Sequence, residues 1–293
     1  MVRILINNSK GVSQPCLTDT EKLFKGWYQD VTVTEDLNLN LAGLNESDNP
    51  VLVIPGGSAL TTGFALSKEF PSLFEELNAP FSVIGICAGA YLLPKTSYLF
   101  DASPHIKSIK QIPPQYLREV GDSFKLGCMD CQAFGPFYPN SYYKMLLHSS
   151  YESPENNMRP YETQVKFRTT GNVLSALYAQ GPLLASKNRD VSVEASFNGR
   201  DEYSFGFPFE EEEVFPSSSA GAVVVQRNDA SNKIKSLIVT GIHPEASVPN
   251  SSLLNFFTKE HPVKLSGESA ARIRRDSLEL SEEFKAILDN TLG

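Results

Sequence analysis

The 293-residue sequence is poor in the residue types that mark several protein classes. It has four cysteines and one tryptophan, and 34 acidic side chains outnumber 26 basic ones, which gives a net charge of −8. Four cysteines are too few for a disulfide scaffold in a chain of this length, so we expect a reducing compartment and a cytoplasmic protein. The shortage of basic residues makes nucleic acids and anionic membranes poor partners.

Long apolar runs are also missing. No stretch approaches the roughly 18 to 20 residues of a membrane helix, so we expect no membrane association. The apolar run Val2–Ile6 is shorter than the roughly 7 to 15 residues of a signal-peptide core, so we expect no leader. A hydrophobic content of 41% and a charged content of 20% are ordinary for a globular protein.

What the first hundred residues do contain is an alternation of strand-like and helix-like segments. Apolar, β-branched runs predict buried strands at Val2–Ile6, Val31–Thr34, Val51–Ile54 and Phe81–Ile86. The segments between them predict helices from Thr18 to about Trp27, from Leu66 to Leu77 with a break at Pro71, and from Ala88 to about Lys95. The alternation predicts an α/β fold with a doubly wound, mainly parallel sheet, whose ligands lie beyond the carboxyl ends of the strands.

The second part of the chain has a different pattern. Residues 100–162 are rich in proline, tyrosine and phenylalanine and predict a loop-rich insertion. β-type segments follow at Gln164–Thr170, Leu174–Ala179, Val191–Phe197, Tyr203–Phe207, Ala220–Arg227 and Lys235–Ile242, and helices are expected after Ser251 and from Ser266 to Asp289. We therefore expect one domain over residues 1–262, with a β-rich elaboration in its second half, and a C-terminal helical extension over residues 263–293. The apolar stripe of the last helix would also suit a neighbouring subunit.

One short stretch has the form of a nucleophile elbow. Cys87 lies between a predicted strand and a predicted helix, with Gly85 and Gly89 two residues to either side. An elbow forces its central residue into a strained conformation, and glycines allow the strand and the helix to approach closely. The alternative is an ordinary buried cysteine, which behaves as a small hydrophobic residue.

A nucleophilic Cys87 needs a base and a group that orients the base. His243 follows a strong predicted strand, and Glu245 comes two residues later. If this segment is extended, as Pro244 favours, the side chains of His243 and Glu245 point to the same side. The sequence therefore predicts a Cys87–His243–Glu245 triad, and the alternative is a hydrogen-bonded pair that only stabilises a loop.

The elbow and the histidine motif together carry a resemblance to a known family. They resemble the class I glutamine amidotransferase-like superfamily and, more narrowly, the amidotransferase-like N-terminal domain of fungal-type biotin–protein ligases. The strings that carry the narrower resemblance are Val53-Ile54-Pro55-Gly56-Gly57, Gly85-Ile86-Cys87-Ala88-Gly89-Ala90-Tyr91, Ala179-Gln180-Gly181-Pro182, Gly221-Ala222-Val223-Val224 and Thr240-Gly241-Ile242-His243-Pro244-Glu245. The resemblance implies a flavodoxin-like fold, an oxyanion hole formed by the amides of Gly57 and Ala88 next to Gly56, and a biotin-related partner enzyme.

Two departures from the family pattern shape the expected function. Tyr91 stands where glutamine amidotransferases usually carry the glutamine that helps to hold their substrate, and the chain has no Gly-Arg-Gly-rich adenylate loop. We expect neither glutaminase activity nor biotinylation. Three hypotheses remain: a cysteine-dependent hydrolase or amidotransferase-like protein acting on a small-molecule or peptide amide or ester; a non-catalytic metabolite-binding or regulatory module on the same fold; and small-molecule thiol chemistry of the glyoxalase or chaperone type, which related elbows carry.

The other cysteines offer one further motif. Cys128 and Cys131 have the spacing of metal ligands, but a structural zinc site needs four ligands, and no second cysteine pair or nearby histidine pair exists. We therefore expect ordinary thiols there, no metal and no cofactor. The sequence leaves the substrate and the oligomeric state open.

Overall fold

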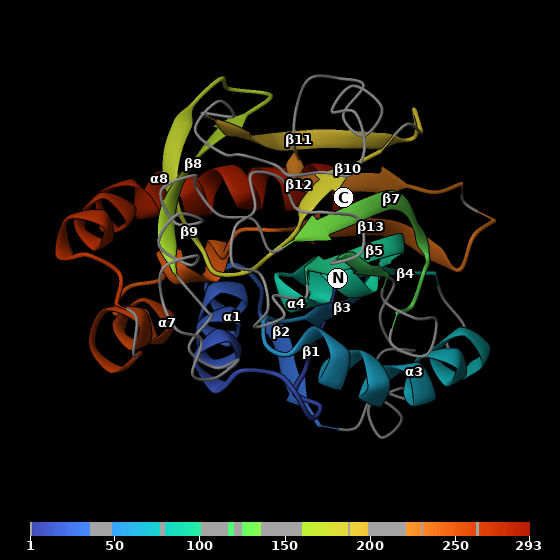
Figure 1. Cartoon of the computed structure of the whole chain (residues 1–293). Helices are drawn as coiled ribbons and strands as arrows, with labels where there is room; N and C mark the ends of the chain where they lie inside the picture. The colour runs from blue at the N-terminus through green and yellow to red at the C-terminus, as the bar shows by residue number, and fades with distance from the viewer. Residues whose placement is uncertain are drawn as a thin grey trace.

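The structure is a computed structural model that describes residues 2–35, 49–76, 80–100, 117–119, 125–135, 160–186, 188–198, 221–229, 231–261 and 264–293. These residues form one thirteen-stranded sheet with helices packed against it (Figure 1). The predicted strand Tyr203–Phe207 and most of residues 100–162 lie outside this part of the chain. The strands are β1 (Val2–Asn7), β2 (Asp30–Thr34), β3 (Asn49–Ile54), β4 (Phe81–Ile86), β5 (Pro94–Phe100), β6 (Leu117–Glu119), β7 (Met129–Gly135), β8 (Tyr161–Phe167), β9 (Val173–Tyr178), β10 (Leu183–Ala185), β11 (Val191–Asn198), β12 (Gly221–Arg227) and β13 (Ile234–Thr240).

The parallel part of the sheet has the strand order β2-β1-β3-β4-β13. This is the flavodoxin-like order, with β13 taking the place of a fifth consecutive strand. The predicted α/β fold is therefore confirmed. The carboxyl ends of β1, β3, β4 and β13 meet at one edge, which is where such sheets bind ligands.

Alternating side chains of the parallel strands face two separate apolar layers. Ile4 and Ile6 belong to the buried cluster that contains side chains of α1 (Gln14–Trp27) and α8 (Gly267–Leu292). Leu5, between them, belongs to the cluster that contains side chains of α3 (Ala59–Glu76) and α4 (Ala88–Leu92). Because successive residues of a strand point to opposite faces, helices on both faces produce the continuous apolar runs seen in the sequence.

The rest of the sheet is mostly antiparallel and extends the parallel part. β12 pairs with β13 in the antiparallel direction, and β10, β7 and β5 continue the sheet beyond it. β11 branches from β12 and leads to β8 and β9. The β-rich second half is thus part of one sheet, although the antiparallel share is larger than the sequence suggested. The proposed boundaries at residues 100, 162 and 262 stay predictions.

Three predicted helix boundaries are wrong. α1 begins at Gln14 rather than Thr18, with Ser13 as its N-cap residue and Pro15 in the first turn, where proline is well tolerated. α3 begins seven residues before Leu66 and continues through Pro71, so the proline does not interrupt it. α4 ends at Leu92, and β5 begins at Pro94, so the helix after the elbow has little more than one turn.

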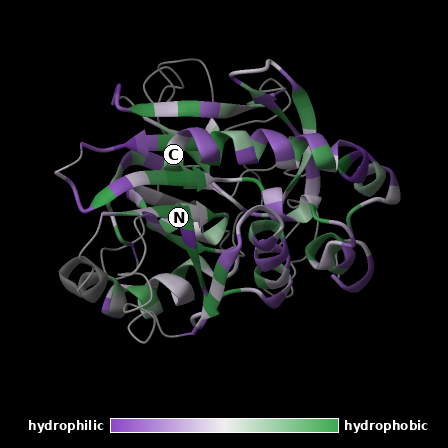
Figure 2. Cartoon of the chain, turned by 180° about the vertical axis from the view of Figure 1, so that it is seen from behind, coloured by the Kyte–Doolittle hydropathy of each residue, from purple (hydrophilic) through white to green (hydrophobic). Residues whose placement is uncertain are grey.

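The last helices agree better with the sequence. Ser251 caps α7 (Ser252–Asn255) by accepting a hydrogen bond from the Leu254 amide, and a π-helical turn, η7 (Phe256–Glu260), follows. Ser266 caps α8 in the same way through the Ser269 amide. Figure 2 shows α8 crossing the back of the molecule with hydrophilic and hydrophobic residues in alternation.

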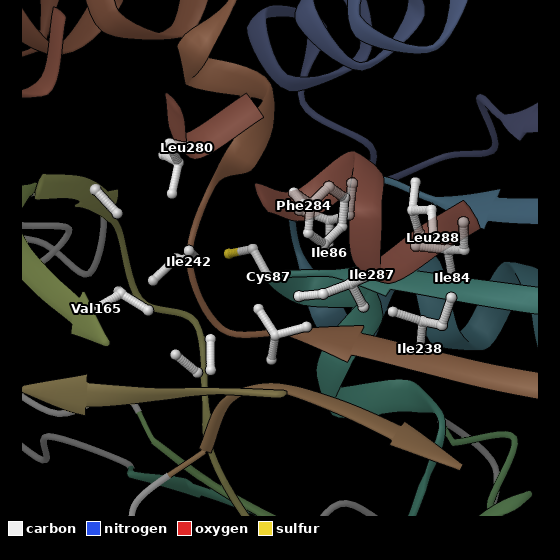
Figure 3. Close-up of a cluster of buried hydrophobic side chains, with 14 of the residues drawn as sticks. Ile84, Ile86, Cys87, Val165, Ile238, Ile242, Leu280, Phe284, Ile287 and Leu288 are labelled. Atoms are coloured by element: carbon white, nitrogen blue, oxygen red, sulfur yellow. The ribbon is translucent and has the colours of Figure 1, made fainter. Parts of the chain in front are cut away.

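The apolar stripe of α8 packs against the chain's own core. Phe284 and Leu288 are buried in the same cluster as Ile84 and Ile86 (Figure 3). The suggestion that this stripe docks a neighbouring subunit is therefore wrong, because the stripe is already covered. Leu278, which also looked like part of the stripe, is 70% exposed. None of the described helices is long and apolar enough to span a membrane.

Candidate active site

The cysteine elbow has the geometry that the sequence predicts. Cys87 follows β4 directly, precedes α4 and has φ +50° and ψ −99°, a region that non-glycine residues rarely adopt. Such a conformation costs of order 1–3 kcal/mol and persists only where the surrounding structure imposes it. The side chain is buried, with 6% of its surface exposed, beside Ile86 and Ile242 (Figure 3).

The two glycines of the elbow are required by close backbone contacts. A Cβ atom on Gly85 would lie 2.6 Å from the Gly89 carbonyl oxygen, and one on Gly89 would lie 2.3 Å from the Ile54 carbonyl oxygen. Real Cβ contacts are not this short, so a side chain at either position would force β3, β4 and α4 apart. The glycines therefore allow the helix to begin directly above the neighbouring strand, as an elbow needs.

His243 and Glu245 form a buried pair at the end of β13. Nδ1 of His243 lies 2.7 Å from Oε1 of Glu245, and the exposed fractions are 2% and 0%. The His243 amide donates to the Leu177 carbonyl, which fixes the histidine backbone to the end of β9. The predicted contact between His243 and Glu245 is therefore present, but the extended backbone that was expected to produce it is not. Pro244 begins a 3₁₀ turn, η6 (Pro244–Ser247), so the segment is not extended.

The carbonyl oxygen of Ala179 links the cysteine and the histidine. It accepts a hydrogen bond from Sγ of Cys87 at 3.2 Å and lies 3.4 Å from Nε2 of His243. A carbonyl can bind either group only when that group carries a proton, as the thiol or as N–H. The Ala179 oxygen therefore favours the protonated form of each group that contacts it, the Cys87 thiol and the Nε2–H of His243. The sequence analysis gave no role to Ala179 itself.

Electrostatics at His243 favour the protonated ring. Burial alone lowers the pKa of His243, but the neighbouring Cys87 and Glu245 outweigh this effect and raise the pKa well above its usual value. The nearby Cys16 side chain acts in the same direction. A protonated imidazole beside Cys87 would stabilise a thiolate, which is the reactive form of cysteine.

The two amides proposed for an oxyanion hole lack hydrogen-bond partners among the described residues. The neighbouring Cys87 amide cannot bind an oxyanion, because it donates to the Thr240 carbonyl at 2.9 Å. Ala88 is the first residue of α4, so its amide has no acceptor within the helix. The Gly57 loop is held against the loop after β1, since Ser58 donates to the Gly11 carbonyl and a Cβ on Gly57 would lie 2.2 Å from that oxygen.

Tyr91 packs against the loop that follows β9. Its hydroxyl donates to the carbonyl of Gln180 at 3.0 Å, and the side chain is buried. The hydroxyl fills the space above Gly135, where a Cβ would lie 2.2 Å from it. Tyr91 thus supports the loop that follows β9 and carries the Ala179 carbonyl. Gln180 in this loop has φ +64°.

Cys16 is a member of the site that the sequence analysis missed. It lies on α1, is buried, and places its Sγ in a group of ligand atoms within 4.8 Å of one another that also includes His243 and Glu245. Burial raises the pKa of Cys16, while His243 acts against this increase. Gly56, expected near the oxyanion hole, lies against both residues, because a Cβ on it would be 2.9 Å from Sγ of Cys16 and 3.1 Å from Cε1 of His243. No local sequence signal joins Cys16 to residues more than two hundred positions away.

Cys128 and Cys131 lie outside the group formed by Cys16, His243 and Glu245. All four cysteines are free. Burial raises the pKa of Cys128 to about 12 and raises that of Cys131 further. Neither belongs to a group of metal-ligating side chains within the described residues.

No family model matches the sequence, and no curated protein matches it. A solved structure titled PurLQS from Thermotoga maritima matches 94% of this chain and 97% of its own, at 12% sequence identity and a TM-score of 0.42.

Proposed function

We propose that this protein is a cysteine-dependent hydrolase or amidotransferase-like protein that acts on an amide or ester of a small molecule or peptide. One observation carries the proposal: a cysteine with a strained backbone shares a hydrogen-bond acceptor with a histidine that is paired with a buried glutamate. Stored strain, an adjacent base and an orienting carboxylate are the three parts of an activated nucleophile.

Each residue has a defined role in the proposed reaction. His243 takes the thiol proton of Cys87 at Nε2, while Glu245 binds Nδ1 and fixes the ring orientation. The thiolate forms a bond to the substrate carbonyl carbon, and the amides of Gly57 and Ala88 bind the resulting oxyanion. His243 then returns the proton to the leaving nitrogen or oxygen, which leaves a thioester on Cys87. Water, or an amine in a transferase, cleaves that thioester.

The experiment is to detect the thioester. The full chain is incubated with a panel of activated acyl esters and amides, and its intact mass is measured before and after hydroxylamine treatment. We expect an acyl adduct on Cys87 that hydroxylamine removes, and no adduct in Cys87→Ser. Cys128→Ser is the matched control, because it removes a thiol outside the site. An adduct that is unchanged in Cys87→Ser contradicts the proposal.

A second candidate function is a binding or regulatory module. The observation in its favour is the Ala179 carbonyl, which lies against both Cys87 and His243 while both side chains are almost fully buried. The resemblance to biotin-ligase accessory domains suggests a biotin-related partner enzyme for such a module. Thermal-shift measurements with biotin, nucleotides, amino acids and acyl-amides test it: a shift that persists in Cys87→Ser, without product, favours the module.

A further inference from the structure

A second group of chemically active side chains overlaps the candidate triad. One ligand atom from each of Cys16, His243 and Glu245 lies within 4.8 Å of the others, and all three residues are buried. They come from two parts of the chain: Cys16 is on α1, and His243 and Glu245 lie at the start of the turn η6. The triad needs only His243 and Glu245 of this group, so the proposed reaction leaves Cys16 unexplained.

Gly56 makes the close approach of Cys16 and His243 feasible. Its missing side chain leaves room for Sγ of Cys16 and the ring edge of His243, which would lie 2.9 Å and 3.1 Å from a Cβ. An alanine at this position would press on both ligands. Glycine at position 56, in the loop after β3, therefore leaves space for the Cys16 thiol and the His243 imidazole to lie next to each other.

Glu245 supplies an independent sign that something is missing from the group. Its Oε1 binds His243, but Oε2 is buried and has no hydrogen-bond partner among the described residues. Buried carboxylate oxygens are usually paired, because an unpaired one has lost its hydration without compensation. The Glu245 carboxylate is also the third member of the group with Cys16 and His243. A cation bound by this group would therefore give the unpaired Oε2 a partner.

The donor set identifies the class of cation. A thiolate sulfur, an imidazole nitrogen and a carboxylate oxygen suit Zn²⁺, whereas Mg²⁺ and Ca²⁺ prefer oxygen ligands alone. Zinc bonds of about 2.0 to 2.3 Å place tetrahedral ligand atoms roughly 3.3 to 3.8 Å apart. The group therefore needs only small side-chain rotations to close around the ion. Three protein ligands would leave the fourth position open.

We propose that Cys16, His243 and Glu245 form a Zn²⁺ site that overlaps the candidate active site. On binding, the Cys16 thiol releases one proton to solvent, a zinc–sulfur bond forms, and no group is oxidised or reduced. Zinc also takes a lone pair of His243 and holds the Glu245 carboxylate. His243 then cannot accept the proton of Cys87, so zinc inhibits the site reversibly; this consequence rests on the proposed function, whereas binding does not.

The test uses cobalt as a spectroscopic substitute for zinc on the metal-free full chain. We expect one equivalent of Co²⁺ to produce a near-ultraviolet thiolate-to-cobalt band, and Zn²⁺ to abolish it. Cys16→Ala should remove the band, and Glu245→Gln should weaken binding by about 10- to 100-fold or more. Cys131→Ala is the matched control and should keep the band. A band that is unchanged in Cys16→Ala overturns the proposal, and so does the absence of any band.

Zinc K-edge absorption on the unmodified chain gives an answer that needs no variant. We expect one sulfur and otherwise nitrogen or oxygen neighbours around the ion, and a shell without sulfur, or with two, overturns the site. Iodoacetamide labelling of Cys87 with and without Zn²⁺ tests the consequence separately. A cobalt band that depends on Cys16, together with an unreactive Cys87, would keep the metal site and reject the enzyme.

Discussion

Cys87 donates a 3.2 Å hydrogen bond from its thiol to the carbonyl oxygen of Ala179. His243 places Nε2 3.4 Å from the same oxygen, on the side opposite to the Nδ1 atom that contacts Glu245. Nucleophile and base therefore share one backbone acceptor instead of facing each other alone. For the proton to pass from sulfur to nitrogen, Cys87 and His243 must turn from this shared acceptor toward each other.

We expect iodoacetamide at limiting concentration and neutral pH to label Cys87 first. By exposure alone Cys128 would react first, because it is only partly buried, whereas Cys87 is buried. However, burial raises the pKa of Cys128 to about 12 and also raises the pKa of Cys16 and Cys131, so few thiolates form there. Peptide mass spectrometry measures the order of labelling. Labelling of Cys128 ahead of Cys87 would remove the case for an activated thiolate.

Glu245→Gln should slow the labelling of Cys87 about 10-fold or more at neutral pH. The negative charge of Glu245 helps to raise the pKa of His243, so its loss lowers that pKa. The imidazolium that stabilises the thiolate then disappears at a lower pH, and the labelling profile of Cys87 should move to higher pH. Stopped-time alkylation from pH 5 to 9 measures the shift. A merely structural role for Glu245 would change stability but leave the shape of the profile unaltered.

Gly89→Ala should destabilise the protein by roughly 1–3 kcal/mol, the usual cost of overpacking. Its Cβ would lie 2.3 Å from the Ile54 carbonyl oxygen, which is backbone and cannot rotate away. Gly26→Ala is the matched control, because nothing lies within 4 Å of its Cβ and it is part of α1. That variant should be neutral or up to about 1 kcal/mol more stable, since alanine favours helix. Urea unfolding measures both; equal stabilities would mean that the elbow is not tightly packed.

Asp19→Ala should cost roughly 2 kcal/mol in unfolding free energy, in line with the loss of charge-assisted hydrogen bonds. Asp19 is fully buried and accepts hydrogen bonds from the Ser252 amide at 2.9 Å, the Leu253 amide at 2.8 Å and the Ser251 hydroxyl at 2.6 Å. It thereby joins α1 to the start of α7. Glu21→Ala, which removes only an exposed ion pair with Lys25, should cost a few tenths of a kcal/mol. Similar losses in the two variants would contradict the role of Asp19.

The sequence predicts those parts of the molecule that depend on local pattern. The strand before Cys87 is an apolar run because it is buried on both faces, and the elbow is marked by Gly85 and Gly89. The contacts that complete the site depend on tertiary structure. Cys16 meets His243 only because α1 packs beside η6, and Ala179 reaches Cys87 through its backbone, which leaves no trace in the residue type.

The helix boundaries failed for a related reason. Ser13 as N-cap residue and Pro15 in the first turn are good starting signals, and α1 begins there rather than at Thr18. Pro71 would end an isolated helix, yet α3 continues through it. The pairing of His243 with Glu245 came from two residue types at a short spacing, so it survived although the predicted backbone conformation did not.

Tyr91→Phe should increase the labelling rate of Cys87 several-fold and cost about 1 kcal/mol in stability, the usual value for one hydrogen bond. The Tyr91 hydroxyl donates to the Gln180 carbonyl and so holds the loop whose Ala179 carbonyl binds the Cys87 thiol. Without the hydroxyl, this loop should open more often and release Cys87 and His243 from their shared acceptor. Labelling kinetics and urea unfolding separate the two effects. A stability loss without faster labelling would mean that the loop does not control access to the cysteine.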